Sequence, residues 1–417
     1  MGIGRVGAGV VVAAELGPAE VAALDPAAVA GLATAGGAPL AHASIIARSL
    51  AIPAVTGLGP EVLALPVGTV VLVDGDAGTV VVEPAADEVA AARARQGAAR
   101  ARQDERRRWA AAPAATADGT PVTVLANVGG AAEAAAAVAE GADGIGMLRT
   151  EFAFLGRPEP PGEDEQFAAY QAVADAVGER PLVVRTLDLG ADVPAWDAPP
   201  EANPALGHRG LRFTLTHRHL LEAQLRAVAR LAGGRPLQVM FPMVTSVDEL
   251  RQARACLDAA MAGPGRRGGA GLEVGITVEV PAAALTASAF APLVDFLAIG
   301  TNDLTQYALA ADRTNPAVAA LADGLHPGVL RLIGEVTAAG EAAGRAVFPV
   351  GELATDPVAV PVLLGLGVRA LSVRPNAVGA VKEAVRAVTV AEARRLAGQA
   401  LAAESAAAVR HLADRWR

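Results

Sequence analysis

The stretch FLAIGTND, residues 296–303, shows the pattern on which the fold prediction rests. Five apolar or small residues that suit a buried strand are followed at once by Asn302 and Asp303. In parallel sheets covered by helices, strands are nearly continuous apolar runs, and functional residues collect at their carboxyl ends. The stretch therefore predicts a buried strand with polar residues at a functional edge.

Similar apolar runs recur over roughly 300 residues and alternate with segments of helical pattern. This alternation predicts a (β/α)8 barrel of the TIM type within an α/β protein. The expected strands are Val122–Ala126, Gly144–Leu148, Leu182–Leu187, Leu237–Phe241, Val274–Glu279, Phe296–Gly300, Ala346–Val350 and Ala370–Val373.

The first part of the chain has a different pattern. Residues 1–86 predict a small α/β domain, with strands at Gly9–Ala14, Thr69–Val73 and Thr79–Glu83 and a helix at Ala43–Leu50. Residues 87–118 predict an arginine-rich helical linker, and residues 119–417 the barrel domain. A solvated connecting helix is favoured over a nucleic-acid patch because aromatic residues are nearly absent.

The composition excludes several classes of protein and site. The 417 residues carry a formal net charge of −9, which argues against general nucleic-acid binding. The single cysteine, Cys256, excludes a disulfide framework within the chain and a Cys-based zinc cluster, and favours a cytoplasmic protein. No uninterrupted apolar segment suits a membrane span, and the valine-rich start is typical of a strand rather than a signal peptide.

Charged and amide side chains follow the predicted strands. At least three arginines, two carboxylates and an amide converging on one barrel mouth could clamp a small phosphorylated acid and hold Mg²⁺. No Walker loop or dinucleotide fingerprint is present, so a nucleotide ligand is not expected. The residues concerned are Asn127, Arg149, Arg185, Glu279, Asn302, Asp303 and Glu352, with Arg209, Arg212 and Arg313 from the connecting segments.

His42 follows a glycine-rich turn and opens a predicted helix, whose free N–H groups favour a phosphoryl group. The surrounding GGAPLAHASIIARSLAIPAV (36–55) resembles the phosphohistidine motif of enzymes that use phosphoenolpyruvate. Four further segments resemble enzyme I, the phosphoenolpyruvate–protein phosphotransferase of the bacterial sugar phosphotransferase system. They are GIGMLRTEF (144–152), VEVPAA (278–283), IGTNDLTQY (299–307) and HPGVL (326–330), and the resemblance covers essentially the whole chain.

The resemblance implies a role for each matching position. His42 would be the phosphorylated histidine of a swivelling domain, and Arg149 and Arg185 would bind the phosphate of phosphoenolpyruvate. Glu279 and Asp303 would hold Mg²⁺, and Asp303 would also lie against the substrate. The remaining substrate contacts would come from Asn302, from Arg313 at the carboxylate end, and from Arg209 as a further clamp. The family also implies a homodimer formed through the barrel.

This chain departs from the family pattern at three places. It begins where the first domain of enzyme I resumes, so the helical region that docks the histidine-containing phosphocarrier protein is not expected. Ala38-Pro39-Leu40-Ala41 lacks the hydroxyl residues that precede the family histidine. Val350 occupies the position of the cysteine that protonates the enolate of pyruvate, so the chain has no predicted proton donor, and Cys256 is expected to be a buried structural residue.

The sequence leaves three functions open. One is transfer of the phosphoryl group of phosphoenolpyruvate to His42 and on to a protein acceptor, with release of pyruvate. The alternative is a degenerate paralogue that binds phosphoenolpyruvate and Mg²⁺ without turnover and acts as a sensor or regulator. A dikinase-like or synthase-like relative is a third reading, although the nucleotide-binding domain of such enzymes has no counterpart in the sequence.

Overall fold

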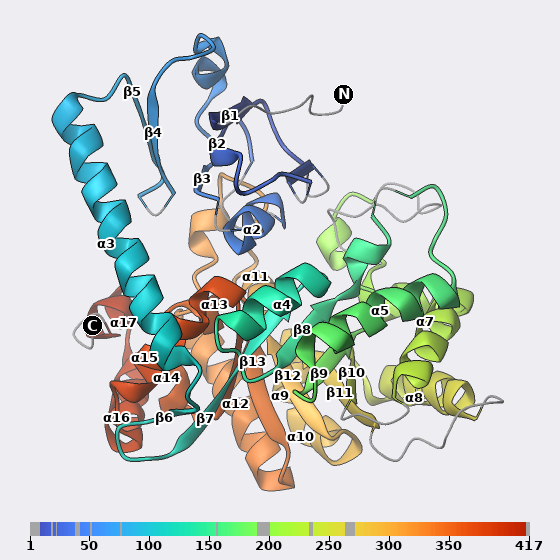
Figure 1. Cartoon of the computed structure of the whole chain (residues 1–417). Coiled ribbons are helices and arrows are strands. Elements are labelled where there is room, and N and C mark those ends of the chain that lie inside the picture. Colours follow the sequence, from blue (N-terminus) through green and yellow to red (C-terminus); the bar gives the residue numbers. More distant parts are fainter. Residues whose placement is uncertain are drawn as a thin grey trace. The chain divides into compact units, whose positions relative to one another are not determined.

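The computed structural model describes residues 9–17, 20–21, 23–37, 42–50, 52–75, 77–155, 157–189, 201–232, 237–262 and 272–413. The chain divides into two compact units, each described by itself. One consists of residues 1–105 with 309–322, and the other of residues 106–308 with 323–417. Figure 1 gives the element labels used below.

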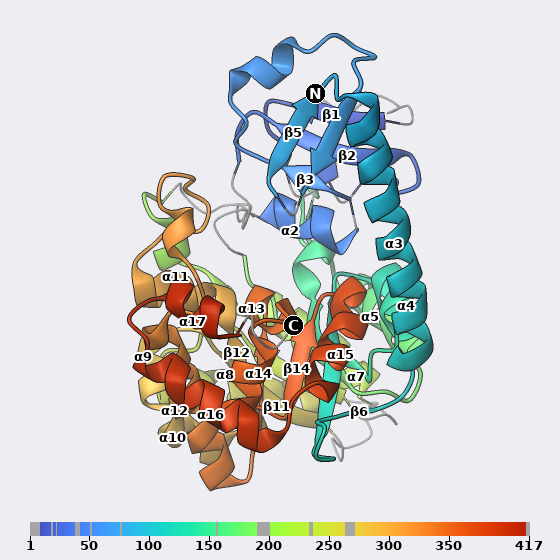
Figure 2. The same cartoon turned by 90° about the vertical axis from the view of Figure 1, so that its left-hand side faces the viewer.

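The first unit contains a parallel three-stranded sheet and a separate hairpin. The sheet has the order β1 (Gly9–Ala13), β2 (Val29–Thr34) and β3 (Ala54–Val55), and the hairpin pairs β4 (Val71–Asp74) with β5 (Thr79–Val82). The sequence pattern predicted β1, β4 and β5 but missed β2 and β3. Figure 2 shows the sheet, the hairpin and α2 (His42–Ser49); the unit also has a short 3-10 helix, η1 (Pro60–Ala64).

The second unit is a closed barrel of eight parallel strands, as predicted. Each strand pairs with the next in sequence, and the last pairs with the first through Ala370–Thr123 to Val373–Ala126, which closes the barrel. A short strand, β6 (Ala114–Ala115), adds antiparallel to the first barrel strand. The barrel strands are β7 (Pro121–Val128), β8 (Ile145–Arg149), β9 (Leu182–Arg185), β10 (Leu237–Phe241), β11 (Leu272–Val278), β12 (Phe296–Gly300), β13 (Ala346–Val350) and β14 (Ala370–Val373).

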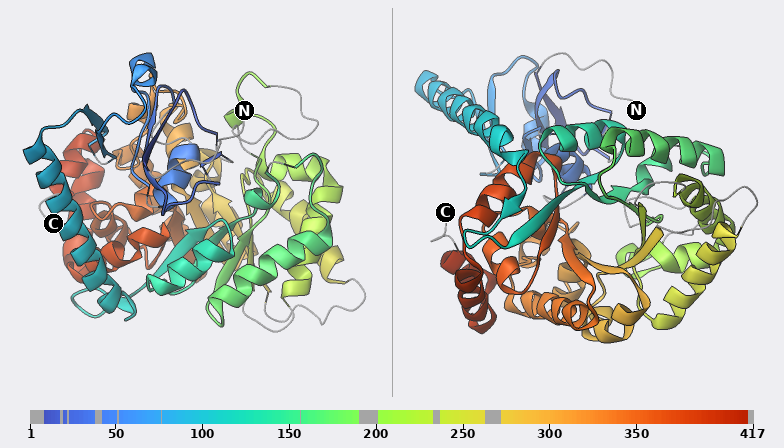
Figure 3. Two further views of the ribbon diagram at one scale, coloured as in Figure 1. Left: turned by 45° about the horizontal axis from the view of Figure 1, so that its top comes forward. Right: turned by 60° about the horizontal axis from the view of Figure 1, so that its bottom comes forward.

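Helices surround these strands (Figure 3). The long α3 (Ala86–Ala110) precedes the barrel and carries the arginine-rich sequence. The other helices are α4 (Ala131–Ala139), α5 (Glu163–Val177), α6 (Gly210–Thr216), α7 (Arg218–Leu231), α8 (Val247–Met261), α9 (Pro281–Leu285), α10 (Ala287–Phe290), α11 (Thr301–Leu309), α12 (Pro327–Ala343), α13 (Glu352–Thr355), α14 (Val360–Gly365), α15 (Val378–Arg386), α16 (Val390–Ala402) and α17 (Ala406–Ala413). The described residues include no helix that is both long and apolar enough to cross a membrane.

The barrel interior is a packed apolar core. Side chains from five strands meet there, and the stacked rings of Phe296 and Phe348 lie at a centroid distance of 5.7 Å. Because successive side chains of a strand alternate between interior and exterior, these buried residues identify the interior face of each strand. The interior cluster comprises Met147, Val183, Met240, Phe296, Ala298, Phe348 and Val350.

Candidate active site

The carboxyl ends of the barrel strands carry the charged side chains predicted from the sequence. Arg149 ends β8 and Arg185 ends β9, and the two residues are register partners in the parallel ladder. Each lies two residues beyond an interior core residue, Met147 or Val183, so both occupy the interior face at the mouth. The structure therefore brings the two predicted phosphate-binding arginines side by side.

Arg185 is held by two carboxylates. Its Nη2 donates to Glu151 Oε1 at 2.8 Å, and its Nη1 lies 3.5 Å from Asp188 Oδ2. Burial opposes the positive charge, but Glu151 and Asp188 outweigh it and raise the pKa of Arg185 above its ordinary value. Its Nε is buried without a hydrogen-bond partner among the described residues. Arg185 is thus a fixed cation with one donor still available to a ligand.

Arg209 connects Asp188 to a further carboxylate, Asp303, across the mouth. Its Nη2 donates to Asp188 Oδ2 at 2.7 Å, and its Nη1 donates to Asp303 Oδ1 at 3.0 Å and to the hydroxyl of Tyr307 at 3.2 Å. Burial disfavours the charged form of Asp188, but Arg209 and Arg185 outweigh it and lower the pKa of that carboxyl. Arg209 therefore orders the acidic residues of the site, in addition to any substrate contact.

The backbone next to Arg209 packs closely against Met243. Gly210 has a φ of +57°, and a Cβ at this position would lie 2.7 Å from the Cβ of Met243. Met243 itself has a φ of +57°, which is uncommon for a residue with a side chain. In this conformation its N–H donates to Glu279 Oε1 at 2.7 Å. The strained residue thus holds one predicted metal ligand in place.

Glu279 follows β11 directly and is buried. Burial is the main cause that raises its pKa to about 8, and the negative charges of Asp303 and Asp188 add to the effect. Gly300 makes room for the carboxylate, since a Cβ there would lie 2.3 Å from Glu279 Oε2. The site therefore concentrates negative charge at a point where a cation would relieve the repulsion.

Arg149 differs from the other two arginines. Its guanidinium makes no hydrogen bond and no ion pair within 4.0 Å with any of the residues that the structure describes. Burial lowers its pKa, and the more distant carboxylates of Glu133, Glu151 and Glu352 oppose that effect. A cation held at a strand end without a direct counter-ion is suited to an anionic ligand.

Asn302 lies in the first turn of α11, and its Oδ1 accepts a hydrogen bond from the backbone N–H of Glu352 at 3.0 Å. This contact ties the end of β12 to the end of β13. The amide nitrogen of Asn302 remains the part of the side chain that can serve a ligand. Asn127, in contrast, is engaged inside the barrel, where its Nδ2 donates to the carbonyl of Ser372 at 3.0 Å.

The two predicted metal ligands suit Mg²⁺. Both Glu279 and Asp303 are buried carboxylates, Glu279 directly after β11 and Asp303 in the first turn of α11 after the neighbouring β12, and Mg²⁺ prefers oxygen ligands while retaining water or substrate oxygens. In the described part of the chain, no group of three or more His, Cys, Asp or Glu side chains is arranged to hold a metal ion. A two-carboxylate site completed by substrate is therefore the arrangement that these residues support.

The other residues singled out from the sequence lie on several different elements. His42 begins α2 in the first unit, and Arg313 lies in the 309–322 segment that belongs to the same unit. Arg212 lies on α6, beyond the buried Arg209. Cys256 is buried on α8, as predicted, and burial raises the pKa of its thiol. The substituted segment 38–41 before His42 lies outside the described residues.

Val350 is buried within the interior cluster at the end of β13. Its neighbours there, including Met147, Met240 and Phe348, carry no acidic proton. Its backbone carbonyl accepts from the Thr301 hydroxyl at 3.0 Å. The position that holds the family's cysteine is therefore apolar and well packed in this chain.

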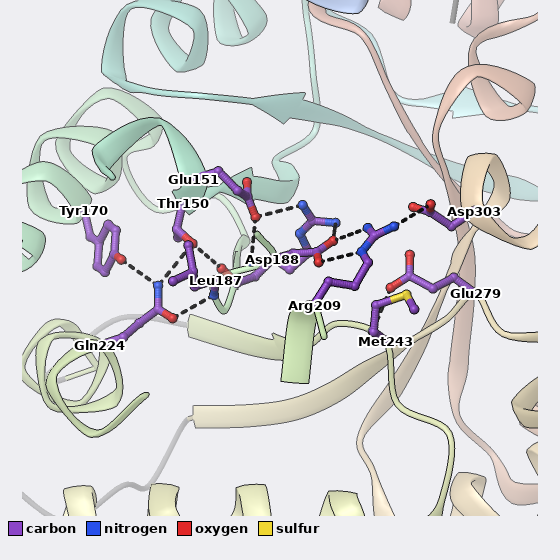
Figure 4. Close-up of polar contacts among 11 residues, drawn as sticks. Thr150, Glu151, Tyr170, Leu187, Asp188, Arg209, Gln224, Met243, Glu279 and Asp303 are labelled. Atoms are coloured by element: carbon purple, nitrogen blue, oxygen red, sulfur yellow. Dashed lines mark hydrogen bonds and ion pairs between the residues drawn. The ribbon is translucent and has the colours of Figure 1, made fainter. Parts of the chain in front are cut away.

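Sequence reasoning missed several residues that organise the site. Glu151 and Asp188 follow the strand-end arginines by two and three residues, and this spacing was the available signal. Gln224 links several parts: its Oε1 accepts from the N–H of Leu187 at 2.7 Å, and its Nε2 donates to Thr150 and Tyr170 (Figure 4). No local sequence pattern marks Gln224, because its partners lie 37 to 74 residues away.

Comparisons with known proteins identify families that match both parts of the chain. Residues 103–390 match the family described as "PEP-utilising enzyme, PEP-binding domain", and residues 7–78 match "PEP-utilising enzyme, mobile domain". The first match spans the barrel and every barrel residue of the site. The second includes the strands of the first unit's sheet and α2, on which His42 lies.

Curated relatives extend the match over nearly the whole chain. A multiphosphoryl transfer protein of Rhodobacter capsulatus is 48% identical over 97% of this chain and 49% of its own length. Phosphoenolpyruvate-protein phosphotransferases of Bacillus sp. (strain S) and Haemophilus influenzae are 40% and 39% identical, over 93% and 98% of this chain and 68% and 72% of their own lengths. The chain thus spans about half of the multiphosphoryl transfer proteins that it matches.

The family match covers more than half of the chain, and it includes both the barrel with its charged mouth and the unit that carries His42. The chain is a member of the PEP-utilising enzyme family, in the group of phosphoenolpyruvate–protein phosphotransferases known as enzyme I.

Proposed function

We propose that this protein transfers the phosphoryl group of phosphoenolpyruvate to His42 and from there to a protein acceptor. The observation that carries the proposal is the set of charges at the barrel mouth. Arg149 and Arg185 stand side by side as cations for the phosphoryl group, and Glu279 and Asp303 stand opposite as oxygen ligands for Mg²⁺. Such a site fits a small, multiply charged acid that binds with a divalent cation.

The reaction needs positioning and charge neutralisation more than covalent help from the barrel. The P–O bond to the enol oxygen breaks, an N–P bond to the imidazole of His42 forms, and the enolate that remains takes a proton at its methylene carbon to give pyruvate. Arg149 and Arg185 hold the phosphoryl oxygens in place, and Arg209 keeps Asp303 aligned. Mg²⁺, when bound, supplies further neutralisation of the oxygens that develop charge.

Domain organisation completes the proposal. Residues 1–86 form a swivelling phosphohistidine domain, residues 87–118 a helical linker, and residues 119–417 the barrel domain. His42 alternates between the barrel mouth and the acceptor, which is a histidine-containing phosphocarrier protein. The barrel domains of two chains form a homodimer, and light scattering of the purified protein would test that statement.

The test is a labelling experiment. The protein is incubated with phosphoenolpyruvate carrying a labelled phosphorus and with Mg²⁺, and the label on the protein is followed at acid and alkaline pH. An acid-labile label that disappears in His42→Ala and persists in the control His411→Ala supports the proposal. No label, or a label that His42→Ala leaves unchanged, excludes phosphoryl transfer to His42.

The apolar surroundings of Val350 favour a second function. Without an acid at this position, the chain could bind phosphoenolpyruvate and Mg²⁺ as a sensor or regulator without turnover. Calorimetric binding of phosphoenolpyruvate without pyruvate release or histidine label supports this function. Pyruvate formation above the uncatalysed rate excludes it.

A further inference from the structure

One further cation stands at the barrel mouth, at the end of the eighth strand, where the sequence patterns indicated no functional residue. Arg374 directly follows β14. Within that strand, Ala370 packs against the interior cluster, and Ser372 is buried next to Asn127 inside the barrel. Arg374 has extended backbone angles, φ −65° and ψ 146°, so the alternation of the strand continues through it. Its side chain therefore leaves β14 on the interior face.

The placement of Arg374 repeats that of the two predicted phosphate-binding arginines. Arg149 lies two residues beyond the interior residue Met147, and Arg185 lies two residues beyond Val183. Arg374 likewise lies two residues beyond the interior residue Ser372. In a barrel with inward side chains arranged in layers, equivalent positions of this kind line the same mouth.

The donors of Arg374 are incompletely used. Among the described residues its one ion pair is with Glu352, at 3.7 Å from Nε to Oε2, which is too long for a hydrogen bond. The Nε atom is buried and has no hydrogen-bond acceptor among the described residues. A buried guanidinium donor without an acceptor is costly, and an anionic oxygen would satisfy it.

Glu352 connects this cation to Arg149. Its carboxylate lies against Arg374, and it also acts electrostatically on Arg149, which has no direct counter-ion in the described part of the chain. The backbone N–H of Glu352 donates to Asn302 Oδ1 at 3.0 Å, which fixes the backbone of Glu352 beside the end of β12, and its carboxylate faces Arg374 at the end of β14. One carboxylate thus serves two arginines in the absence of ligand.

We infer that Arg374 is a further substrate-binding residue, which joins Arg149 in contacting the phosphoryl oxygens of phosphoenolpyruvate. The inference rests on the proposed function, because it concerns the same substrate. In the absence of ligand, the carboxylate of Glu352 lies near Arg374 without accepting a hydrogen bond from its Nε atom. The phosphoryl group provides the acceptor that this Nε atom lacks. The cation of the eighth strand thereby adds to those of the second and third strands.

Calorimetry with three ligands tests this assignment. Phosphoenolpyruvate, inorganic phosphate and pyruvate are titrated, each with Mg²⁺, into the unchanged protein and into Arg374→Gln. The affinity for phosphoenolpyruvate and for phosphate should fall about tenfold or more in the variant, since a charge-assisted hydrogen bond is lost. The affinity for pyruvate should change less than about twofold, because pyruvate has no phosphoryl group.

Arg369→Gln is the matched control, because Arg369 precedes the same strand at its opposite end and donates to the carbonyls of Leu364 and Val368. Its ligand affinities should equal those of the unchanged protein. Arg374→Lys should recover part of the lost affinity, because it retains the charge without the planar donor geometry. Equal phosphoenolpyruvate affinity in Arg374→Gln and the unchanged protein would overturn the assignment, as would an equal loss for pyruvate.

A second variant tests the inference independently, in case Arg374→Gln does not fold. Glu352→Gln removes the carboxylate that holds Arg374, so phosphate should bind about two- to fivefold more tightly. That gain should vanish in the double variant with Arg374→Lys if Arg374 is responsible for it. Unchanged or weaker phosphate binding in Glu352→Gln contradicts the inference. Absence of phosphoenolpyruvate binding by the unchanged protein would instead overturn the proposed function together with this inference.

Discussion

The guanidinium of Arg209 reaches Asp303 Oδ1 at 3.0 Å while it is also bound to Asp188 Oδ2 at 2.7 Å. An arginine predicted as a substrate clamp therefore also neutralises a predicted metal ligand. Both members of the Arg209–Asp303 pair are buried, so each charge depends strongly on the other. This ion pair therefore sets the charge of the acidic residues at the mouth in the absence of ligand.

Replacing Arg209 by Met should strengthen the binding of Mg²⁺ alone by about tenfold, because a cation that competes for Asp303 is removed. The unfolding free energy in the absence of Mg²⁺ should fall by about 3 kcal/mol, since two buried carboxylates lose their partner. Added Mg²⁺ should recover part of that loss. Calorimetry and thermal unfolding with and without Mg²⁺ measure these effects, and Arg212→Met, on the same helix, is the control. Weaker Mg²⁺ binding in Arg209→Met would show that Arg209 does not compete with Mg²⁺ for Asp303.

Glu279→Gln should weaken Mg²⁺ binding by at least about tenfold, because a neutral amide oxygen replaces an anionic ligand. The fold should be retained, since the amide oxygen of Gln can still accept the N–H of Met243. Glu273→Gln provides the control, because Glu273 is exposed at the opposite end of the same strand. Titration of Mg²⁺ in the presence of phosphoenolpyruvate is the measurement. Equal Mg²⁺ dependence in both variants would show that Glu279 is not a ligand of the metal.

Val350→Cys should increase pyruvate formation, on the order of 100-fold where proton delivery limits the rate. The change fits the available volume, because a thiol replaces two methyl groups in a packed cluster. Val347→Cys is the control, since Val347 lies on the same strand against Gly340 of α12. Pyruvate is measured with a coupled assay. An unchanged rate in Val350→Cys would show that solvent or another group already delivers the proton.

Lys382→Met should lower the unfolding free energy of the barrel unit by about 3–5 kcal/mol. The only lysine of the chain is fully buried, and its Nζ donates to Asp143 Oδ1 at 2.7 Å and to the carbonyls of Gly141 and Ala110 at 2.8 and 2.9 Å. Urea unfolding measures the change. The double variant with Asp143→Asn should lose less than the sum of the two single losses, because the two residues form one pair.

The exposed Arg395→Met is the control for the lysine variant and should change stability by less than about 0.5 kcal/mol. A loss for Lys382→Met as small as that of the control would show that the buried ammonium group contributes no net stability.

Much of the fold could be predicted from the sequence. The barrel strands were identifiable because each is an apolar run that ends at a charged or turn residue, and β10, β12, β13 and β14 have the predicted boundaries. The strand β2 (Val29–Thr34) was missed because it consists largely of alanine and glycine, which have weak strand preference. The strand expected at Leu182–Leu187 ends at Arg185, since the chain there turns toward Glu151.

The candidate site was predictable in part for the same reason. Alternation along a strand places a residue on the interior face, so Arg149, Arg185 and Glu279 could be assigned to the mouth from local pattern alone. Arg374 obeys the same rule, but its strand ends without a recognisable motif. The pairing of Arg209 with Asp303 was beyond prediction, because the two residues are separated by 94 positions.

The sequence by itself determined which residue types stand at the ends of the strands and therefore which chemistry the mouth can support. That information is local, because strand alternation and the boundary between apolar and polar residues act over a few neighbouring positions. Only the tertiary structure decided which arginines are neutralised by carboxylates and which retain free donors. Burial and Coulomb energies depend on distances between segments far apart in the chain, and these distances exist only after the barrel closes.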